Sequence, residues 1–265
     1  MELTISIVGA DGTVKARASG TEEAKLVYAA AYEEGDVICL DGSQPGYVAA
    51  KLEDSMDEVL GWLSGQFRLM APFGEKRVSY SPRAFTGGAH LLQARAAGRD
   101  EVSAYRNLAL NPLDSHENSG LFPHASANVE TLGESVFAAR NAIDGCWAND
   151  SHGAWPYQSW GINRDPEAEL TLDFGREVEI HRLVFTLRAD FPHDNWWKRC
   201  TVRFSDGSEI TPEFVKTGAR QTVELERRGA RWLKVCRLIK DEGDLSPFPA
   251  LTQLEVWGTE APLQS

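Results

Sequence analysis

Hydrophobic and polar residues alternate in short segments of the C-terminal half of the chain. In the segment 167–175, Ala168, Leu170, Leu172 and Phe174 are separated by polar residues. A period of two residues predicts a strand with one face in the core. The same period recurs in four further segments, at 181–190, 201–210, 221–235 and 251–258.

Turn residues separate these strands. Asp206-Gly207 lies between Val202 and Ile210, which is a strong hairpin signal. Gly229 predicts a turn that divides the segment 221–235. At least five short strands, with turns between them and no long helical period, predict an antiparallel β-sandwich.

The N-terminal half contains further strand-like segments, at 25–32, 35–42 and 88–97. The segment 53–67 is ambiguous, because Val59 and Leu63 fit a helix while Gly61 and Gly65 weaken it. We therefore expect an all-β protein with two β-sandwich (jelly-roll) domains. The expected boundaries are 1–98 for the first domain, 99–119 for a linker anchored by Tyr105 and Leu108, and 120–260 for the second domain.

The charge and the cysteine content limit the classes of partner and the cellular compartment that we expect. The net charge of −12 disfavours nucleic acid and anionic membranes and favours a neutral or cationic ligand. No apolar stretch is long enough to span a membrane, and the first residues lack the pattern of a signal peptide. The four cysteines are widely spaced, without a C-x-x-C pair. We expect a cytoplasmic protein with reduced thiols.

Five short motifs occur in order in the second half: "HASAN" (124–128), "AARNAIDG" (138–145), "AELTLDFG" (168–175), "VRFSDG" (202–207) and "LEVWG" (254–258). Together they resemble the discoidin, or coagulation-factor C-type, family of galactose-binding-like domains, which includes carbohydrate-binding modules. "VRFSDG" is one residue shorter than the family's hairpin. The whole chain is also similar to bacterial proteins known only as carbohydrate-binding.

The resemblance implies that ligand binds on three loops at one end of the sandwich, here 129–136, 146–162 and 188–198. Two of these loops are rich in aromatic residues. A tryptophan face covers the C–H patch of a sugar ring, and nearby polar groups bind its hydroxyls. We expect a solvent-exposed rim made from Glu130, His152, Trp155, Tyr157, Trp160, Arg188, Asp190, His193, Asp194, Trp196 and Trp197.

A structural role for some of these aromatic residues stays open. Eight tryptophans in one chain cannot all face a ligand, and some of them are expected to fill the core. Trp196 and Trp197 are adjacent and point to opposite faces if the chain is extended there, so at most one faces ligand.

The family often carries a structural calcium ion near the "AIDG" turn. Calcium binds six to eight oxygen ligands. The resemblance therefore implies a calcium site, for which the candidate ligands are Asp144, Asn149 and Asp150, with Gln253 or Glu255 from the last strand.

Three functions remain open from the sequence. The first is a non-catalytic carbohydrate-binding protein. The second is a glycoside-active enzyme that uses two of the loop carboxylates, which are Glu130, Glu134, Asp190 and Asp194. The third is a protein-binding adaptor, since a fold does not fix a function.

Overall fold

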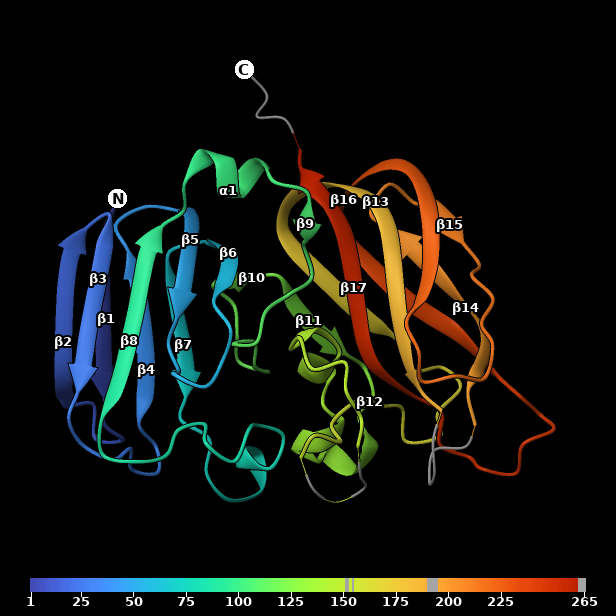
Figure 1. Ribbon diagram of the computed structural model, residues 1–265, viewed down its shortest axis with the longest axis horizontal. Helices are drawn as coiled ribbons and strands as arrows, with labels where there is room; N and C mark the ends of the chain where they lie inside the picture. Colours follow the sequence, from blue (N-terminus) through green and yellow to red (C-terminus); the bar gives the residue numbers. More distant parts are fainter. Residues whose placement is uncertain (151–152, 154, 190–194, 262–265) are drawn as a thin grey trace.

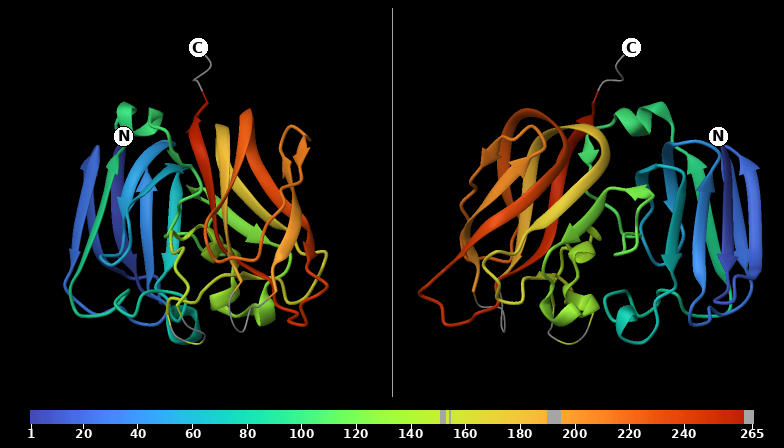
Figure 2. Two further views of the ribbon diagram at one scale, coloured as in Figure 1. Left: turned by 45° about the vertical axis from the view of Figure 1, so that its right-hand side comes forward. Right: turned by 180° about the vertical axis from the view of Figure 1, so that it is seen from behind.

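The computed structural model describes residues 1–150, 153, 155–189 and 195–261. Two β-sandwiches lie side by side, the first in blue and teal and the second in yellow to red (Figures 1 and 2). The one α-helix of the described residues is α1 (Arg99–Ser103), and no helix among them is long and apolar enough to cross a membrane. The predicted all-β fold is confirmed.

The N-terminal sandwich contains two antiparallel sheets. One has the order β2 (Val14–Thr21), β1 (Glu2–Val8), β4 (Val37–Gly42), β7 (Gln66–Met70). The other has the order β10 (Leu121–Phe122), β6 (Val59–Leu63), β5 (Gly46–Lys51), β8 (His90–Ala96), β3 (Glu23–Tyr28).

Alternation explains these strands, including those of the ambiguous segment 53–67. Val59, Gly61 and Leu63 of β6 are buried, and the two residues between them are only half-buried. The spacing that also fits a helix thus belongs to a strand, which β5 and β10 flank on its two sides.

The C-terminal sandwich is formed by one continuous set of eight strands. The main path is β12 (Trp160–Gly161), β17 (Ala250–Glu260), β13 (Leu170–Arg188), β16 (Gln221–Lys240), β14 (Trp197–Phe204), β15 (Glu209–Ile210). Two short strands join it at the side: β11 (His124–Ala127) pairs with β13, and β9 (Arg106–Asn107) pairs with β17.

Two strand boundaries differ from the prediction. The predicted strands in 167–175 and 181–190 are parts of one strand, β13, which spans Leu170–Arg188, and β16 continues through Gly229 without a turn. Shifts of register between Asp173 and Val178 let β13 bend while it stays paired with β16. The predicted hairpin at Asp206-Gly207 is confirmed, with Gly207 at a φ of +83° between β14 and β15.

The segment between the sandwiches pairs with both of them. β9 lies beside β17 in the C-terminal sandwich, and β10 lies beside β6 in the N-terminal one (Figure 1). Asp114 ties this segment to β11: its Oδ1 lies 2.8 Å from His124 Nδ1, and its Oδ2 accepts a 2.8 Å hydrogen bond from the Ala125 amide. Backbone pairing and a buried carboxylate therefore connect the two sandwiches.

Irregular segments of both sandwiches meet at the end drawn at the bottom of Figure 1. The segment 71–89 follows β7 and contains the 3-10 helix η1 (Gly74–Arg77). Opposite it lie three 3-10 helices that follow β11: η2 (Thr131–Gly133), η3 (Ser135–Phe137) and η4 (Ala139–Ile143).

Candidate functional site

Direct contacts join the segment 71–89 to the predicted ligand loops. Glu75 accepts a 2.6 Å hydrogen bond from the Ser135 amide at Oε1, and its carbonyl accepts a 2.8 Å bond from Ser135 Oγ. The Arg140 guanidinium lies 4.3 Å from the centre of the Tyr80 ring. The N-terminal sandwich therefore faces the rim that the sequence predicted to be open to solvent.

Three adjoining cavities follow this contact and together form what we call the junction groove. The Trp155 cavity has a volume of about 340 Å³, the Asp144 cavity about 250 Å³ and the Glu75 cavity about 130 Å³. Tyr80 lines all three, and Trp155 lines the first two. Pockets of about 300–1,000 Å³ are the usual size for small ligands.

The Trp155 cavity combines aromatic residues with a single type of charge. Trp155 is 40% exposed and Tyr157 is half-buried. The segment 71–89 supplies the opposite wall, with Arg77, Tyr80 and other residues. Among the described residues, the lining consists of Gly74, Arg77, Val78, Tyr80, Pro82, Gly153, Trp155 and Tyr157.

Arg188 supports the Tyr157 side of this cavity from behind. Its side chain is almost completely buried, and Nη1 donates to the Tyr157 carbonyl. The guanidinium carbon lies 5.8 Å from the centre of the Tyr157 ring. Arg188, predicted to contact ligand, thus positions the loop that carries Tyr157.

Two of the predicted ligand tryptophans lie in the hydrophobic core. Trp160 is 0% exposed and Trp197 is 1% exposed, and their rings are 5.8 Å apart. Trp160 Nε1 donates a 3.0 Å hydrogen bond to the Val129 carbonyl. Neither ring is open to a ligand in this structure, because β12 and β14 turn both of them inward.

Trp196 is less buried than its neighbour Trp197. It is half-buried, packs against the core and has Lys216 Nζ 5.6 Å from its ring centre. It lines none of the three cavities. His152, Asp190, His193 and Asp194 lie outside the described residues.

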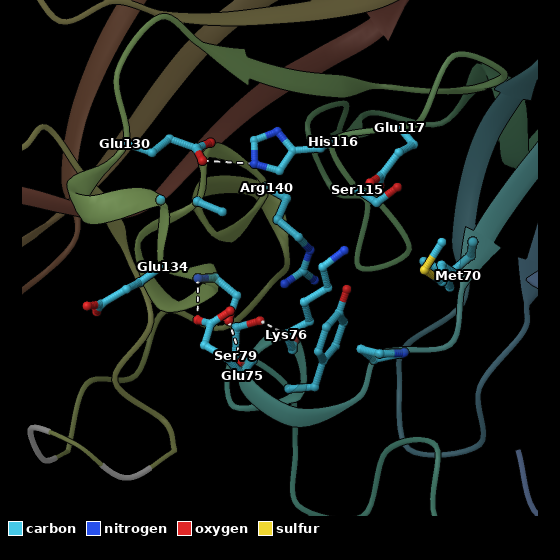
Figure 3. Close-up of a pocket in the computed structure, with 16 residues that line it drawn as sticks. Met70, Glu75, Lys76, Ser79, Ser115, His116, Glu117, Glu130, Glu134 and Arg140 are labelled. Carbon is cyan, nitrogen blue, oxygen red and sulfur yellow. Dashed lines mark hydrogen bonds and ion pairs between the residues drawn. The ribbon is translucent and has the colours of Figure 1, made fainter. Parts of the chain in front are cut away.

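Glu130 lines the Glu75 cavity, where its carboxylate is already engaged (Figure 3). Oε1 accepts a 2.7 Å bond from the Ala139 amide, and Oε2 lies 2.8 Å from His116 Nε2. This hydrogen bond raises the pKa of His116. The Glu134 carboxylate points away from His116 and Arg140 in Figure 3. Glu130 and Glu134, two of the four carboxylates of the enzyme alternative, therefore do not face one another.

The predicted calcium ligands are not brought together. Asp144 accepts hydrogen bonds from the Cys146 amide (2.8 Å) and from Gln158 (3.1 Å), and burial raises its pKa to about 6. Glu255 accepts a 2.8 Å bond from Trp257 Nε1 and pairs with Arg220.

The other two candidates are also separate from Glu255. Asn149 donates to Thr252 Oγ1 at 3.1 Å, and Asp150 is exposed. The described part of the chain contains no group of three or more His, Cys, Asp or Glu side chains placed to hold a metal ion.

An amide makes the contact between the last strand and the "AIDG" turn. Gln253 Oε1 accepts a 3.1 Å bond from the Gly145 amide, and its Nε2 donates to the Ala142 carbonyl at 2.5 Å. These neutral bonds hold the turn against β17. The calcium site that the resemblance implied stays a prediction.

Sequence reasoning missed the wall that the N-terminal sandwich contributes. Tyr80 is only 9% exposed, and it lines all three cavities. The segment "GEKRVSYSPR" (74–83) has neither a helix nor a strand period. Its three basic residues and one tyrosine, in a stretch without a period, are the signal that could have indicated a surface role.

Comparisons with known proteins were made for the whole chain. No family model matches it, and no curated protein matches it. Solved structures that match in part are carbohydrate-binding modules and lectin domains. The lectin domain of lectinolysin complexed with Lewis B antigen is 19% identical, with 58% of this chain and 96% of that chain covered and a TM-score of 0.42.

Two further matches have similar values. Chitosan-binding module 1 of a chitosanase/glucanase from Paenibacillus sp. IK-5 is 19% identical, with 57% of this chain and 98% of that chain covered and a TM-score of 0.39. The family 32 module from C. perfringens NanJ in complex with galactose is 17% identical, with 50% and 91% covered and a TM-score of 0.39. None of these matches assigns the chain to a family.

Proposed function

We propose that this chain is a non-catalytic carbohydrate-binding protein whose ligand occupies the Trp155 cavity. One observation carries the proposal: a solvent-accessible indole and a tyrosine ring line a cavity of about 340 Å³. A sugar ring stacks its C–H face on such aromatic surfaces, while its hydroxyls need donors and acceptors beside them. Arg77 and the Tyr80 hydroxyl supply donors in the opposite wall.

The groove also supports binding because its walls are fixed before the ligand arrives. The Glu75–Ser135 hydrogen bonds and the Arg140–Tyr80 contact hold the two sandwiches together at this end. Rigid walls reduce the entropy lost when a ligand is bound. An uncharged ligand such as a neutral sugar gains from this preorganisation, because it cannot form ion pairs.

The test is a glycan array followed by calorimetry on the sugars that bind. Replacing Trp155→Ala should weaken binding by about 1–3 kcal/mol, the usual cost of losing an aromatic contact at the centre of a site. The matched control is Trp147→Ala, because Trp147 is 58% exposed and lines none of the three cavities. This control should bind like the parent.

Two results would overturn the proposal. Equal affinity of the parent and the Trp155→Ala variant would remove the Trp155 cavity as the site. Release of products from a bound oligosaccharide, followed by chromatography, would replace the binding protein by the enzyme alternative.

A further inference from the structure

The charge of the Trp155 cavity is opposite in sign to the charge of the whole chain. The chain carries a net charge of −12, which by itself favours a neutral or cationic ligand. Arg77 is nevertheless the only charged residue among the described residues that line this cavity. A ligand responds to the groups within a few ångströms, because salt screens more distant charges.

The guanidinium of Arg77 is held in place without being neutralised. Nη2 donates a 2.9 Å hydrogen bond to the carbonyl of Pro82, which lines the same cavity. Arg77 forms no ion pair with any described residue, and its side chain is half-buried. One N–H donor of the Arg77 guanidinium is therefore engaged, and its other donors remain available to a ligand.

A guanidinium held in this way is suited to binding a carboxylate. The planar guanidinium presents parallel N–H donors that match both oxygens of a carboxylate, and such charge-assisted pairs are stronger than neutral hydrogen bonds. The Tyr80 hydroxyl, which has no hydrogen bond within the described residues, adds a donor in the same wall.

We infer that the Trp155 cavity binds an acidic sugar, with Arg77 pairing its carboxylate while the ring lies against Trp155. This inference rests on the proposed function and adds the chemical class of the ligand. It also limits where the acid lies. Across Tyr80, the Glu75 cavity is lined by four glutamates (Glu75, Glu117, Glu130 and Glu134) against Lys76, Arg140 and His116. Its charge therefore stays negative, which disfavours a second anionic unit there.

The probes are therefore single sugar units rather than a polyanion. D-galacturonate, its methyl ester and D-galactose form one series, and the matching glucuronate compounds form another. The ester keeps the ring and removes only the charge. We expect the acid to bind at least about tenfold more tightly than its ester in one series, with the difference shrinking when salt rises to about 0.5 M.

The variant is Arg77→Gln, which should lose the preference for the acid while still binding the neutral sugar. Arg83→Gln is the matched control, since Arg83 is exposed in the same segment and lines none of the cavities. It should keep the parent's preference. Binding is measured by calorimetry, and circular dichroism checks that each variant is folded.

The outcomes separate the inference from the proposed function. If esters bind as tightly as acids, or Arg77→Gln weakens acid and neutral sugars equally, the inference is wrong and a Trp155-dependent neutral site remains. If no sugar in these series or on the array binds, both fail. If acids are preferred but the Trp155→Ala variant binds them normally, the charge assignment survives and the stacking assignment does not.

Discussion

Two of the contacts between the sandwiches are built differently. At the end of β17, Glu260 accepts hydrogen bonds from Tyr47 (2.8 Å), Arg106 (2.6 Å) and Arg176 (2.7 and 3.0 Å). We call this set the Glu260 clamp. At the junction groove, the Tyr80 hydroxyl makes no hydrogen bond within the described residues, and Arg77 and Arg140 form no ion pair there.

The Glu260 clamp stabilises the fold, and the junction groove is left available for binding. The clamp joins β5, β9, β13 and β17 through one carboxylate whose two oxygens are both engaged. It fixes the sandwiches relative to one another, so the groove exists before a ligand binds. The groove keeps hydrogen-bond donors and aromatic surface available to a ligand. This lowers the stability of the groove, and the Glu260 clamp offsets that loss elsewhere in the molecule.

The largest expected effect comes from breaking the clamp. Glu260→Ala leaves two arginines facing each other without the carboxylate between them, and the side chains of Glu260 and Arg176 are 7% and 9% exposed. Removing one partner of a buried ion pair costs about 3 kcal/mol or more. Urea unfolding measures the loss. As a control, Glu209→Ala removes exposed ion pairs with Arg203 and Arg237 and should change stability far less.

The pH dependence of that loss gives a second check. Burial alone raises the pKa of Glu260, but Arg176 and Arg106 more than reverse this, so its pKa is lowered. The stabilisation is therefore present above the pKa of the unfolded state and is lost as pH falls. The parent and the Glu260→Ala variant should converge in acid. A difference in stability that persists in acid would show that the clamp stabilises the protein by packing rather than by charge.

The next effect has the opposite sign and lies in the groove. Burial raises the pKa of Asp144 from 3.8 to about 6, so its charged form is unfavourable in the folded protein. The full shift corresponds to about 3 kcal/mol, and we expect about 2 kcal/mol because the side chain is half-buried. Asp144→Asn should stabilise the protein by this amount at pH 8.

The sign of this effect follows from linkage. A raised carboxyl pKa means that the contribution of Asp144 to stability is most favourable below 3.8 and is lost as pH rises through about 6. The Asn variant lacks this loss. Melting temperatures measured from pH 4 to pH 8 should therefore diverge over that interval, and parallel curves would contradict a buried, strained carboxylate at the groove.

A matched pair of tyrosines compares the two contacts most directly. Tyr47→Phe removes a hydroxyl that donates to the charged Glu260 and should cost about 1.5 kcal/mol. Tyr80→Phe removes a hydroxyl without a hydrogen bond among the described residues and should change stability by less than about 0.5 kcal/mol. Equal losses in urea unfolding would mean that the two contacts are built alike.

The sequence predicted what depends on local order and missed what depends on tertiary contact. Alternation in 167–175 and the Asp206-Gly207 turn identified strands because burial on one face has a period of two. Gly229 was interpreted as a turn, but pairing with its neighbours keeps β16 continuous there. A glycine permits a turn and does not require one.

The candidate site was only partly predictable for a similar reason. Trp155 and Trp160 are five residues apart in one aromatic stretch, yet one lines a cavity and the other fills the core. Pairing of β12 with β17 decides this, and no local pattern reports it. Tyr80 and Arg77 enter the groove only because the N-terminal sandwich packs against the second one, which a reading of each half alone does not reveal.

The smallest expected effect concerns His116 at the edge of the Glu75 cavity. The hydrogen bond to Glu130 raises the pKa of His116, so the pair contributes below the pKa of the unfolded state and is lost as pH rises through the folded value. The His116 side chain is 63% exposed, which limits the contribution to a few tenths of a kcal/mol.

An NMR titration of His116 detects this contribution more directly than unfolding does. In a Glu130→Gln variant, the His116 midpoint should fall while that of His124, which pairs with Asp114, stays in place. A His116 midpoint unchanged by the substitution would mean that the pair does not form in solution, and the groove would then lose one of the contacts that define its edge.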